Sequence, residues 1–284
     1  MLMKCIFTID VEDWYHILDS PQAPLPAAWD NLPSRVERNF EALLAMLAAV
    51  DVKATCFFLG WIAQRYPHLV KAAQAAGHDI ASHGNEHRLA FEMTEKELYD
   101  DAVTSKKILE DMTGKEVSGF RAAGFSLTES TPWFLETLAR AGYSYDSSLF
   151  PTARTHGGIK AGRIEPYHII TQHGSITEFP ISVISILGKR LSFFGGGYLR
   201  LYPYGFIHKM AVNVLQENRP VIFYLHPRDI DPDQPRLPLS FYRRYKSYVN
   251  LSRTKAKVEK LLEQFEWTTM TEYVSDNKGA LRIP

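Results

Sequence analysis

The sequence predicts an α/β fold built on a mainly parallel sheet, and three observations support this prediction. First, apolar segments of strand length alternate with amphipathic segments of helix length over the first half of the chain. Second, polar residues cluster directly after the predicted strands, where parallel sheets carry their functional residues. Third, 284 residues with 45% hydrophobic composition suit one large domain. The pattern fits a sheet that is either open or closed as a barrel.

The first strand and helix follow one another at the N-terminus. Residues 4–9 form an apolar run that ends in the acidic cluster "DVED". The next segment, "SRVERNFEALLAMLAAVDV", begins at Ser34, a residue type that favours the helix N-cap. It places apolar side chains at helical intervals: Val36, Phe40, Leu43, Leu44 and Leu47. This is one β-α unit.

The same alternation then repeats along the chain. The segment 94–114 has the clearest ends, because Thr94 and Glu97 match a capping box and Gly114 follows the last turn. The remaining elements are strands at 53–59, 78–82, 117–121, 143–145 and 220–226, and helices at 67–76 and 131–141.

Residues 150–205 break the alternation, and we interpret them as an insertion within one domain that spans 1–284. The insertion is rich in glycine and aromatic residues, as in "SFFGGGYLRLYPYG". It contains no phosphate-binding loop and no dinucleotide fingerprint, so we expect it to border the functional site instead. An amphipathic helix is predicted at 252–265, with Val258, Leu261, Leu262 and Phe265 on one face.

Charge and cysteine content exclude several classes of function. The 32 basic and 32 acidic side chains cancel, so no overall field attracts nucleic acid or an anionic membrane. Cys5 and Cys56 lie in apolar runs and are expected to be free thiols in the core. No signal peptide and no transmembrane segment are recognised, which favours a cytoplasmic location. The oligomeric state is left open.

Two histidines and an acidic cluster are the strongest candidates for a metal site. His83 and His87 in "SHGNEH" are four residues apart, a spacing that on one helical turn allows both imidazoles to bind one metal. Alone, such a pair is more often a chance surface feature. The "TIDVED" cluster, which ends the first strand, supplies Asp10, Glu12 and Asp13. Two histidines and one carboxylate would leave metal positions open for water and substrate.

Five short motifs occur in a fixed order between residues 8 and 227: "TIDVED", "SHGNEH", "FRAAGFS", "YDSS" and "YLHP". In this order they resemble the polysaccharide deacetylases of the NodB-homology type, carbohydrate esterase family four. The phrases "DVEDWYH", "GGGYLRLYPY" and "FYLHPRDIDP" look most like the subgroup found with bacterial exopolysaccharide synthesis. The resemblance implies a single-domain distorted (β/α) barrel. It also implies metal-dependent hydrolysis of N-acetyl groups on an amino-sugar saccharide, with release of acetate.

The resemblance further assigns a metal site. His83 and His87 would bind a divalent metal, most plausibly zinc, with cobalt, manganese and nickel as alternatives. A carboxylate from "DVED" would be the third ligand. The common family form has adjacent aspartates, whereas Val11 stands between Asp10 and Glu12 here. Strand alternation places Glu12 on the side of Asp10, so Glu12 is favoured and Asp13 is the competing ligand.

Catalytic roles also follow from the resemblance. Asp10 would be the general base, held ionised by Arg121, and His226 would be the general acid. Asp146 would orient His226 and favour its protonated form. A second set of residues would contact the substrate: a backbone N–H near Gly124 at the developing oxyanion, Phe125 beside it, and Trp14 stacked on a sugar ring. The family's usual Arg-Pro-Pro-Tyr loop is Arg-Ala-Ala-Gly-Phe here.

Two alternative functions fit the same residues. The first is a metal-dependent hydrolase of another C–N bond, in a small amide, a cyclic imide or a lipid-linked amino sugar. The altered "DVED" and "RAAGF" motifs favour this alternative. The second is an inactive saccharide-binding protein, which would have no physical need for both a base and an acid. An N-acetylated saccharide is thus the expected partner in either the main hypothesis or the second alternative.

Overall fold

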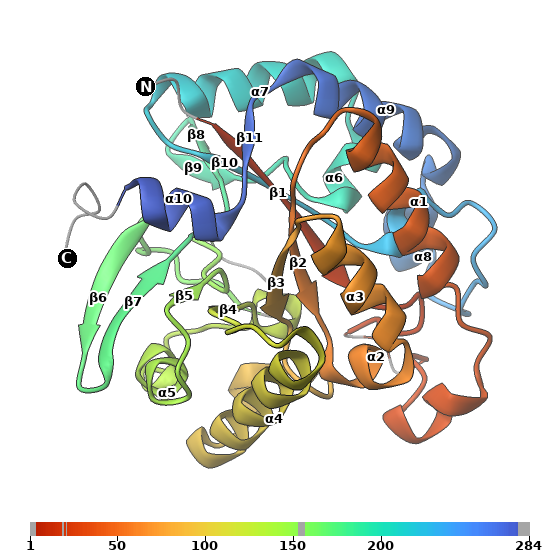
Figure 1. The fold of residues 1–284 in the computed structure, drawn as a ribbon. Coiled ribbons are helices and arrows are strands. Elements are labelled where there is room, and N and C mark those ends of the chain that lie inside the picture. The colour runs from red at the N-terminus through yellow and green to blue at the C-terminus, as the bar shows by residue number, and fades with distance from the viewer. Residues whose placement is uncertain (1–3, 19, 21, 153–156, 278–284) are drawn as a thin grey trace.

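The computed structural model describes residues 4–18, 20, 22–152 and 157–277, which form a curved sheet surrounded by helices (Figure 1). The predicted α/β class with a mainly parallel sheet is confirmed. The strands of the main sheet are β1 (Cys5–Val11), β2 (Thr55–Phe58), β3 (Asp79–Ser82), β4 (Gly119–Phe120), β5 (Tyr145–Asp146), β6 (Tyr167–Thr171), β7 (Gly174–Glu178), β10 (Val221–Leu225) and β11 (Trp267–Thr268).

The strand order explains how distant motifs meet. The order is β10-β1-β2-β3-β4-β5-β7-β6, with β11 also paired to β1. All neighbours are parallel except the β6–β7 hairpin. Between β10 and β6 no pairing closes the ring among the described residues, so the barrel is incomplete. Because β10 pairs with β1 from Cys5↔Val221 to Ile9↔Leu225, the "YLHP" motif lies beside "TIDVED".

The helices cover the outer side of this sheet, with α1 to α3 beside its first strands and α7 and α9 together near β10 (Figure 1). Their bounds are α1 (Val36–Ala49), α2 (Gly60–Arg65), α3 (Pro67–Ala75), α4 (Glu95–Thr113), α5 (Phe134–Arg140), α6 (Gly196–Leu201), α7 (Tyr204–Gln216), α8 (Phe241–Tyr248), α9 (Leu251–Gln264) and α10 (Met270–Asp276). Four short 3-10 turns also occur: η1 (Pro26–Asn31), η2 (Ala90–Glu92), η3 (Ala123–Phe125) and η4 (Pro227–Ile230).

Side-chain alternation along β1 determines what faces the interior of the barrel. Phe7 and Ile9 pack outward in the large core under the helices. Ile6 faces inward, in a smaller core with Phe57 of β2 and Ile222 of β10. Since alternate residues share a face, Asp10 belongs to the same side of β1 as Ile6. The buried inner face of the sheet therefore ends in a carboxylate.

Several elements were not predicted from the sequence. The segment 150–205, predicted as an insertion, contributes the β6–β7 hairpin, and β7 extends the main sheet beside β5. It also contains a separate hairpin of β8 (Ile184–Ile186) and β9 (Lys189–Leu191). The predicted strands and helices of the first half are present, and α2 is additional. Cys5 and Cys56 are buried free thiols. No described helix is long and apolar enough to cross a membrane.

Candidate active site

A cavity of about 370 Å³ opens at the carboxyl ends of the parallel strands, where the motifs converge. Its wall combines residues from the first half of the chain with residues from the last third. The first group is Asp10, Glu12, His16, Ile17, Leu18, His83, His87, Gly124 and Phe125. The second group includes Gly197, Tyr198, Arg200, Tyr224, His226, Arg228, Asp229, Tyr245 and Lys246.

Glu12, His83 and His87 form a cluster that fits a metal ion. Each offers one ligand atom, these atoms lie within 4.8 Å of one another, and all three residues are buried. Nδ1 of His83 is hydrogen-bonded to the carbonyl of Arg121 at 2.8 Å, which leaves Nε2 as its ligand atom. Burial is the main cause that lowers the pKa of His83 to about 4, so its imidazole is neutral, as a ligand must be.

The Glu12 carboxylate supplies the strongest sign that a cation belongs there. Its Oε2 is buried, and Nε2 of His87 lies only 2.5 Å away. Burial acts to raise the pKa of Glu12, but His87, His226 and His83 outweigh it and hold the pKa well below its usual range. A buried, ionised carboxylate that faces two imidazoles matches the donor set of zinc-type metals.

The histidine pair is held by a loop and not by a helical turn, so the predicted helical spacing is wrong. Gly84 and His87 both have positive φ, at +77° and +55°. The Asp101 carboxylate of α4 accepts the N–H groups of Asn85 at 2.9 Å and Glu86 at 3.3 Å. A Cβ on Gly84 would lie 2.8 Å from that carboxylate. Glycine at position 84 therefore allows the loop to close on Asp101 and brings both imidazoles together.

Asp10 and Arg121 form a fully buried ion pair, as the resemblance implied. Nη1 of Arg121 lies 2.6 Å from Oδ1 of Asp10 and also donates to the hydroxyl of Thr8. Its other donors bind the carbonyl and hydroxyl of Ser147, and the guanidinium lies over the ring of Phe57. Every part of the guanidinium is occupied, so the Asp10 carboxylate is held in one position.

His226 lies next to both carboxylates of the acidic motif. Its Nε2 is 3.4 Å from Oε1 of Glu12 and 3.8 Å from Oδ2 of Asp10. Its Nδ1 is hydrogen-bonded to Oδ2 of Asp229 at 3.1 Å. Burial acts to lower the pKa of His226, but Glu12, Asp229 and Asp10 outweigh it and raise the pKa to about 9. The imidazolium can therefore donate a proton.

Asp229 orients His226, so the role predicted for Asp146 is wrong. Asp146 instead accepts hydrogen bonds from the N–H and hydroxyl of Ser148. Asp146 also lies opposite Glu178 of β7 in the sheet. Burial raises the pKa of both carboxyl groups, and that of Glu178 lies well above its usual range. Asp146 and Glu178 thus lie opposite one another on β5 and β7, and Asp146 makes no hydrogen bond to His226 in the described part of the chain.

The glycine-rich segment supplies a partner for Asp229. Arg200 of α6 is buried and forms an ion pair with Asp229 through Nη1. A Cβ on Gly196 would lie 1.9 Å from Oδ2 of Asp229, and a Cβ on Gly195 would lie 2.1 Å from the ring of Tyr224. The glycines therefore let α6 approach the carboxylate closely. Sequence reasoning did not identify Arg200 or Asp229, although Asp229 follows His226 by three residues.

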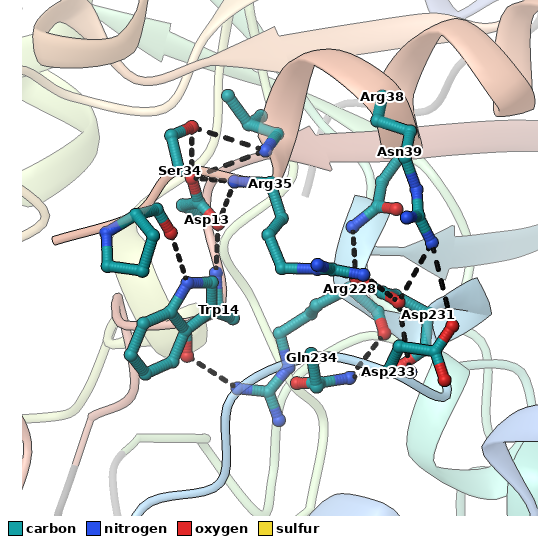
Figure 2. A network of polar contacts seen from close by, with 12 residues as sticks. Asp13, Trp14, Ser34, Arg35, Arg38, Asn39, Arg228, Asp231, Asp233 and Gln234 are labelled. Atoms are coloured by element: carbon teal, nitrogen blue, oxygen red, sulfur yellow. Dashed lines mark hydrogen bonds and ion pairs between the residues drawn. The ribbon is translucent and has the colours of Figure 1, made fainter.

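Asp13 caps a helix and is not a ligand in this structure (Figure 2). Its carboxylate accepts the N–H groups of Trp14, Arg35 and Val36. The hydroxyl of Ser34, predicted to cap α1 itself, donates to Asp13 at 2.6 Å. The carboxylate thus accepts backbone N–H groups at the start of α1 that have no partner within the helix. Glu12 is the member of the acidic pair that faces the histidines.

A second buried carboxylate connects the same helix start to the loop after β10 (Figure 2). Asp231 accepts Nε of Arg35 at 2.5 Å and Nη2 at 2.9 Å, and it also accepts the side-chain amide of Asn39. Arg35 thus binds Asp13 through its main chain and Asp231 through its guanidinium. One residue joins the loop that carries Glu12 to the loop that carries His226 and Asp229.

The predicted substrate contacts divide into two groups. Gly124 and Phe125 line the cavity, both with positive φ. Trp14 does not line it: the indole is buried with Tyr15 and Trp29 and donates to the carbonyl of Pro33. The stacking role predicted for Trp14 is therefore wrong. From the sequence, His16 is expected to be a structural or exposed histidine, yet it lines the cavity, and its buried Nε2 has no hydrogen-bond partner among the described residues.

Two family models match this chain. Residues 21–145 match the polysaccharide deacetylase model, and residues 147–275 match a domain of unknown function, DUF3473. The boundary between them falls within β5. The cavity is therefore built from both regions, because His83, His87 and Arg121 lie in the first while Arg200, His226 and Asp229 lie in the second.

Sequence relatives cover part of the chain. A peptidoglycan deacetylase from Helicobacter pylori is 28% identical over 44% of this chain and 42% of its own length. A peptidoglycan-N-acetylglucosamine deacetylase from Bacillus cereus is 32% identical over 36% of this chain and 46% of its own length. The chain thus spans less than half the length of these two relatives.

A solved structure matches nearly the whole chain. It is a Mycobacterium smegmatis protein whose description places it among the polysaccharide deacetylases. It has a TM-score of 0.64 at 20% identity and covers 99% of this chain and 94% of that protein. At this identity the likeness concerns the fold, which both regions of the present chain share with that protein.

Proposed function

Because residues 21–145 of this chain match the polysaccharide deacetylase model, we propose that the protein removes N-acetyl groups from an amino-sugar saccharide and releases acetate. One observation carries the proposal. Glu12, His83 and His87 meet in one cavity with the Asp10–Arg121 pair and with His226. Amide hydrolysis needs a base, an acid and an electrophile within reach of one carbonyl, and this cavity offers groups for all three roles.

Glu12, His83 and His87 would hold a divalent metal of the zinc type. When bound, such a metal polarises the amide carbonyl and lowers the pKa of water. Asp10 accepts the proton of the attacking water, and the ion pair with Arg121 fixes its carboxylate in place. His226 then donates its Nε2 proton to the leaving nitrogen, so that water and the N-acetyl group become acetate and a free amine. Asp229 holds Nδ1 of His226 during this transfer.

An exopolysaccharide or its precursor is the substrate that we propose. The support is the sequence resemblance of "DVEDWYH", "GGGYLRLYPY" and "FYLHPRDIDP" to the subgroup found with exopolysaccharide synthesis. The cytoplasmic location stays a prediction, which fractionation of the native host would check.

Elemental analysis of the purified protein is the first test, compared with a His83→Ala/His87→Ala variant. We expect about one equivalent of a zinc-type metal, lost in the variant. The matched control is His68→Ala/His173→Ala, which removes two exposed histidines far from the cluster in sequence and should keep the metal. Metal that is absent and cannot be reloaded, or metal retained in His83→Ala/His87→Ala, contradicts the proposed site.

Acetate release from N-acetylated oligosaccharides is the second test. The metal-loaded protein should release acetate, and Asp10→Asn should keep the metal while turnover falls by about 100-fold or more. Hydrolysis of small cyclic amides without acetate would favour the alternative C–N hydrolase. Saccharide binding without turnover, unchanged by Asp10→Asn, would identify an inactive binding protein.

A further inference from the structure

Positively charged side chains are concentrated in one segment beside the cavity, although the chain as a whole has no net charge. Residues 234–258 contain seven basic side chains and no acidic one. The basic residues are Arg236, Arg243, Arg244, Lys246, Arg253, Lys255 and Lys257. This segment includes α8, whose Tyr245, Lys246 and Ser247 line the cavity that holds His83 and His226. Of the seven, Lys246 lies in the wall of the cavity, so part of this positive charge faces the proposed substrate site.

Not every cation of this segment is available to a ligand. Nζ of Lys257 donates to the carbonyls of Leu199 and Tyr202 and so completes the end of α6. Arg243 donates to the carbonyl of Leu18, on the opposite rim of the cavity. This contact ties α8 to the loop that carries Leu18.

Two other cations of the wall have no carboxylate partner in the described part of the chain. Lys246 is exposed and lies over the ring of Tyr242 at 4.4 Å. Arg228 is half-buried and donates to the carbonyl of Trp14 at 3.4 Å, as Figure 2 shows. A neutral ligand would gain little from an unpaired lysine and an unpaired arginine at this position.

The carboxylates of the cavity do not neutralise these cations. Asp10 is paired with Arg121, and Asp229 is paired with Arg200. Glu12 faces His83 and His87 in the proposed metal site. Lys246 and Arg228 therefore add positive charge to a wall whose negative charges are already engaged, which favours a ligand that brings its own negative charge.

Exposed aromatic side chains accompany this charge. Phe241, Tyr242 and Tyr245 of α8 are 88%, 64% and 51% exposed. Tyr245 lines the cavity, so its ring is available to a sugar that extends from the catalytic centre. An anionic bilayer also attracts aromatic and basic residues, but a flat surface cannot enter the cavity that Lys246 and Tyr245 line. The placement of these side chains favours a chain-like ligand.

We propose that the side of the cavity formed by Arg228, Tyr245 and Lys246, here called the α8 wall, is a subsite for an acidic saccharide. The substrate of this protein would then carry anionic groups near its N-acetylated sugar. The inference rests on the proposed deacetylase function and specifies its substrate class. Lys246 and Arg228 bind the anionic group, and Tyr245 contacts an adjoining ring. The negative charge is a carboxylate along the saccharide or a phosphate at its end, because both chemistries satisfy lysine and arginine.

Calorimetric titration of the metal-loaded protein tests this subsite without measuring turnover. The ligands are a hyaluronan hexasaccharide, which has carboxylates, UDP-N-acetylglucosamine, which has phosphates, and neutral chitohexaose. At low salt we expect at least one anionic ligand to bind about tenfold more tightly than chitohexaose, and high salt should remove the difference. The anionic ligand that binds identifies the source of the charge.

Variants of the wall complete the test. Arg228→Gln/Lys246→Gln should lose most of the preference for the anionic ligand and keep chitohexaose binding. Lys71→Gln/Lys115→Gln, which removes two exposed lysines outside the cavity, should keep the preference. Equal affinity for neutral and anionic ligands in the wild type overturns the inference, even if acetate is released. The inference is also overturned if Arg228→Gln/Lys246→Gln loses binding to phosphatidylglycerol vesicles but keeps its affinity for the anionic saccharides. Tight acidic-saccharide binding without acetate release would contradict the deacetylase function alone.

Discussion

At the scale of single residues, the orientation of His226 depends on neighbours that hold its Nδ1 side. Asp229 binds Nδ1, and Arg200 binds Asp229. Burial acts to raise the pKa of Asp229, but Arg200 and His226 outweigh it and hold the pKa well below its usual range. An ionised, fixed carboxylate selects the tautomer and the ring position of the imidazole. These two residues therefore determine which nitrogen faces the cavity.

Asp229→Asn is expected to reduce kcat by about 100-fold or more, because the imidazole loses the carboxylate that orients and charges it. Steady-state acetate release measures this effect, and thermal unfolding checks that the variant is folded. Asp146→Asn is the control, since the carboxylate of Asp146 is hydrogen-bonded to Ser148 and not to His226. A larger loss of kcat in Asp146→Asn than in Asp229→Asn would restore the role predicted from the sequence.

Asp101 gives a pH dependence of stability that can be isolated. Burial raises its pKa to about 6 and outweighs the N–H groups of Asn85 and Glu86. The ordinary pKa of an aspartate is about 3.9, so the folded state binds this proton more tightly than the unfolded state. The contribution of Asp101 to stability is therefore greatest below about pH 4 and falls as the pH rises to about 6.

The free energy of unfolding of the wild type, minus that of Asp101→Asn, should decrease by about 1 to 3 kcal/mol over this pH window and stay constant above it. Urea unfolding of both proteins at a series of pH values measures the difference. Other titrating groups are common to both proteins and cancel. A difference that does not change with pH would show that Asp101 does not titrate in this range.

At the scale of elements, close approach of α6 to η4 depends on the glycine run. Gly196 begins α6, where its missing side chain leaves room for the Asp229 carboxylate. The ion pair from Arg200, one turn later in the same helix, then fixes the distance between α6 and the loop after β10. Close packing against Tyr224 and Asp229 explains Gly195 and Gly196 of this run, and phosphate binding is not needed to account for them.

Gly196→Ala should displace Asp229, because its Cβ would lie 1.9 Å from Oδ2. We expect kcat to fall by about tenfold or more and stability to fall by about 1 to 3 kcal/mol. Gly205→Ala in α7 is the control, since nothing lies within 4 Å of its Cβ and alanine favours a helix. Unchanged kinetics in Gly196→Ala would show that α6 yields without moving Asp229.

At the scale of the whole molecule, the two regions that the family models separate share one sheet and one cavity. β1 lies between β2 of the first region and β10 of the second, and β11 also pairs with β1. All seven residues of β1 are buried, so its edge cannot be left open to solvent without exposing the core. The division at residue 145 is therefore a boundary between sequence families and not between independently folding units.

A fragment of residues 1–146 should not fold alone, because it lacks β10 and β11, two of the three strands that pair with β1. Circular dichroism during heating would show no cooperative transition. Co-expression with residues 147–284 should restore a soluble complex, since β10 can still pair with β1. A cooperatively folded fragment that binds metal by itself would contradict this dependence.

The sequence determined the features that depend on local pattern. Apolar periodicity and turn residues predicted most strands and helices of the first half, because these signals extend over a few residues. The ordered motifs identified Asp10, Glu12, His83, His87, Arg121 and His226, since polar residues after parallel strands meet at one edge. The short hairpins, α2 and the loop conformation of His83–His87 were missed. They depend on glycine geometry and pairing that helical spacing does not reveal.

Only the tertiary structure decided which side chains act on one another. Asp13 and Glu12 are adjacent in sequence, yet one caps α1 and the other faces the histidines. Asp146 lies in a recognised motif, but it is Asp229 that binds His226. Asp229 is in turn paired with Arg200, which lies in the segment 150–205 that was predicted to be an insertion. Such partnerships depend on distances of a few ångströms between segments far apart along the chain. The packing of β10, η4 and α6 against β1 sets those distances, whereas periodicity and composition report only what each segment does locally.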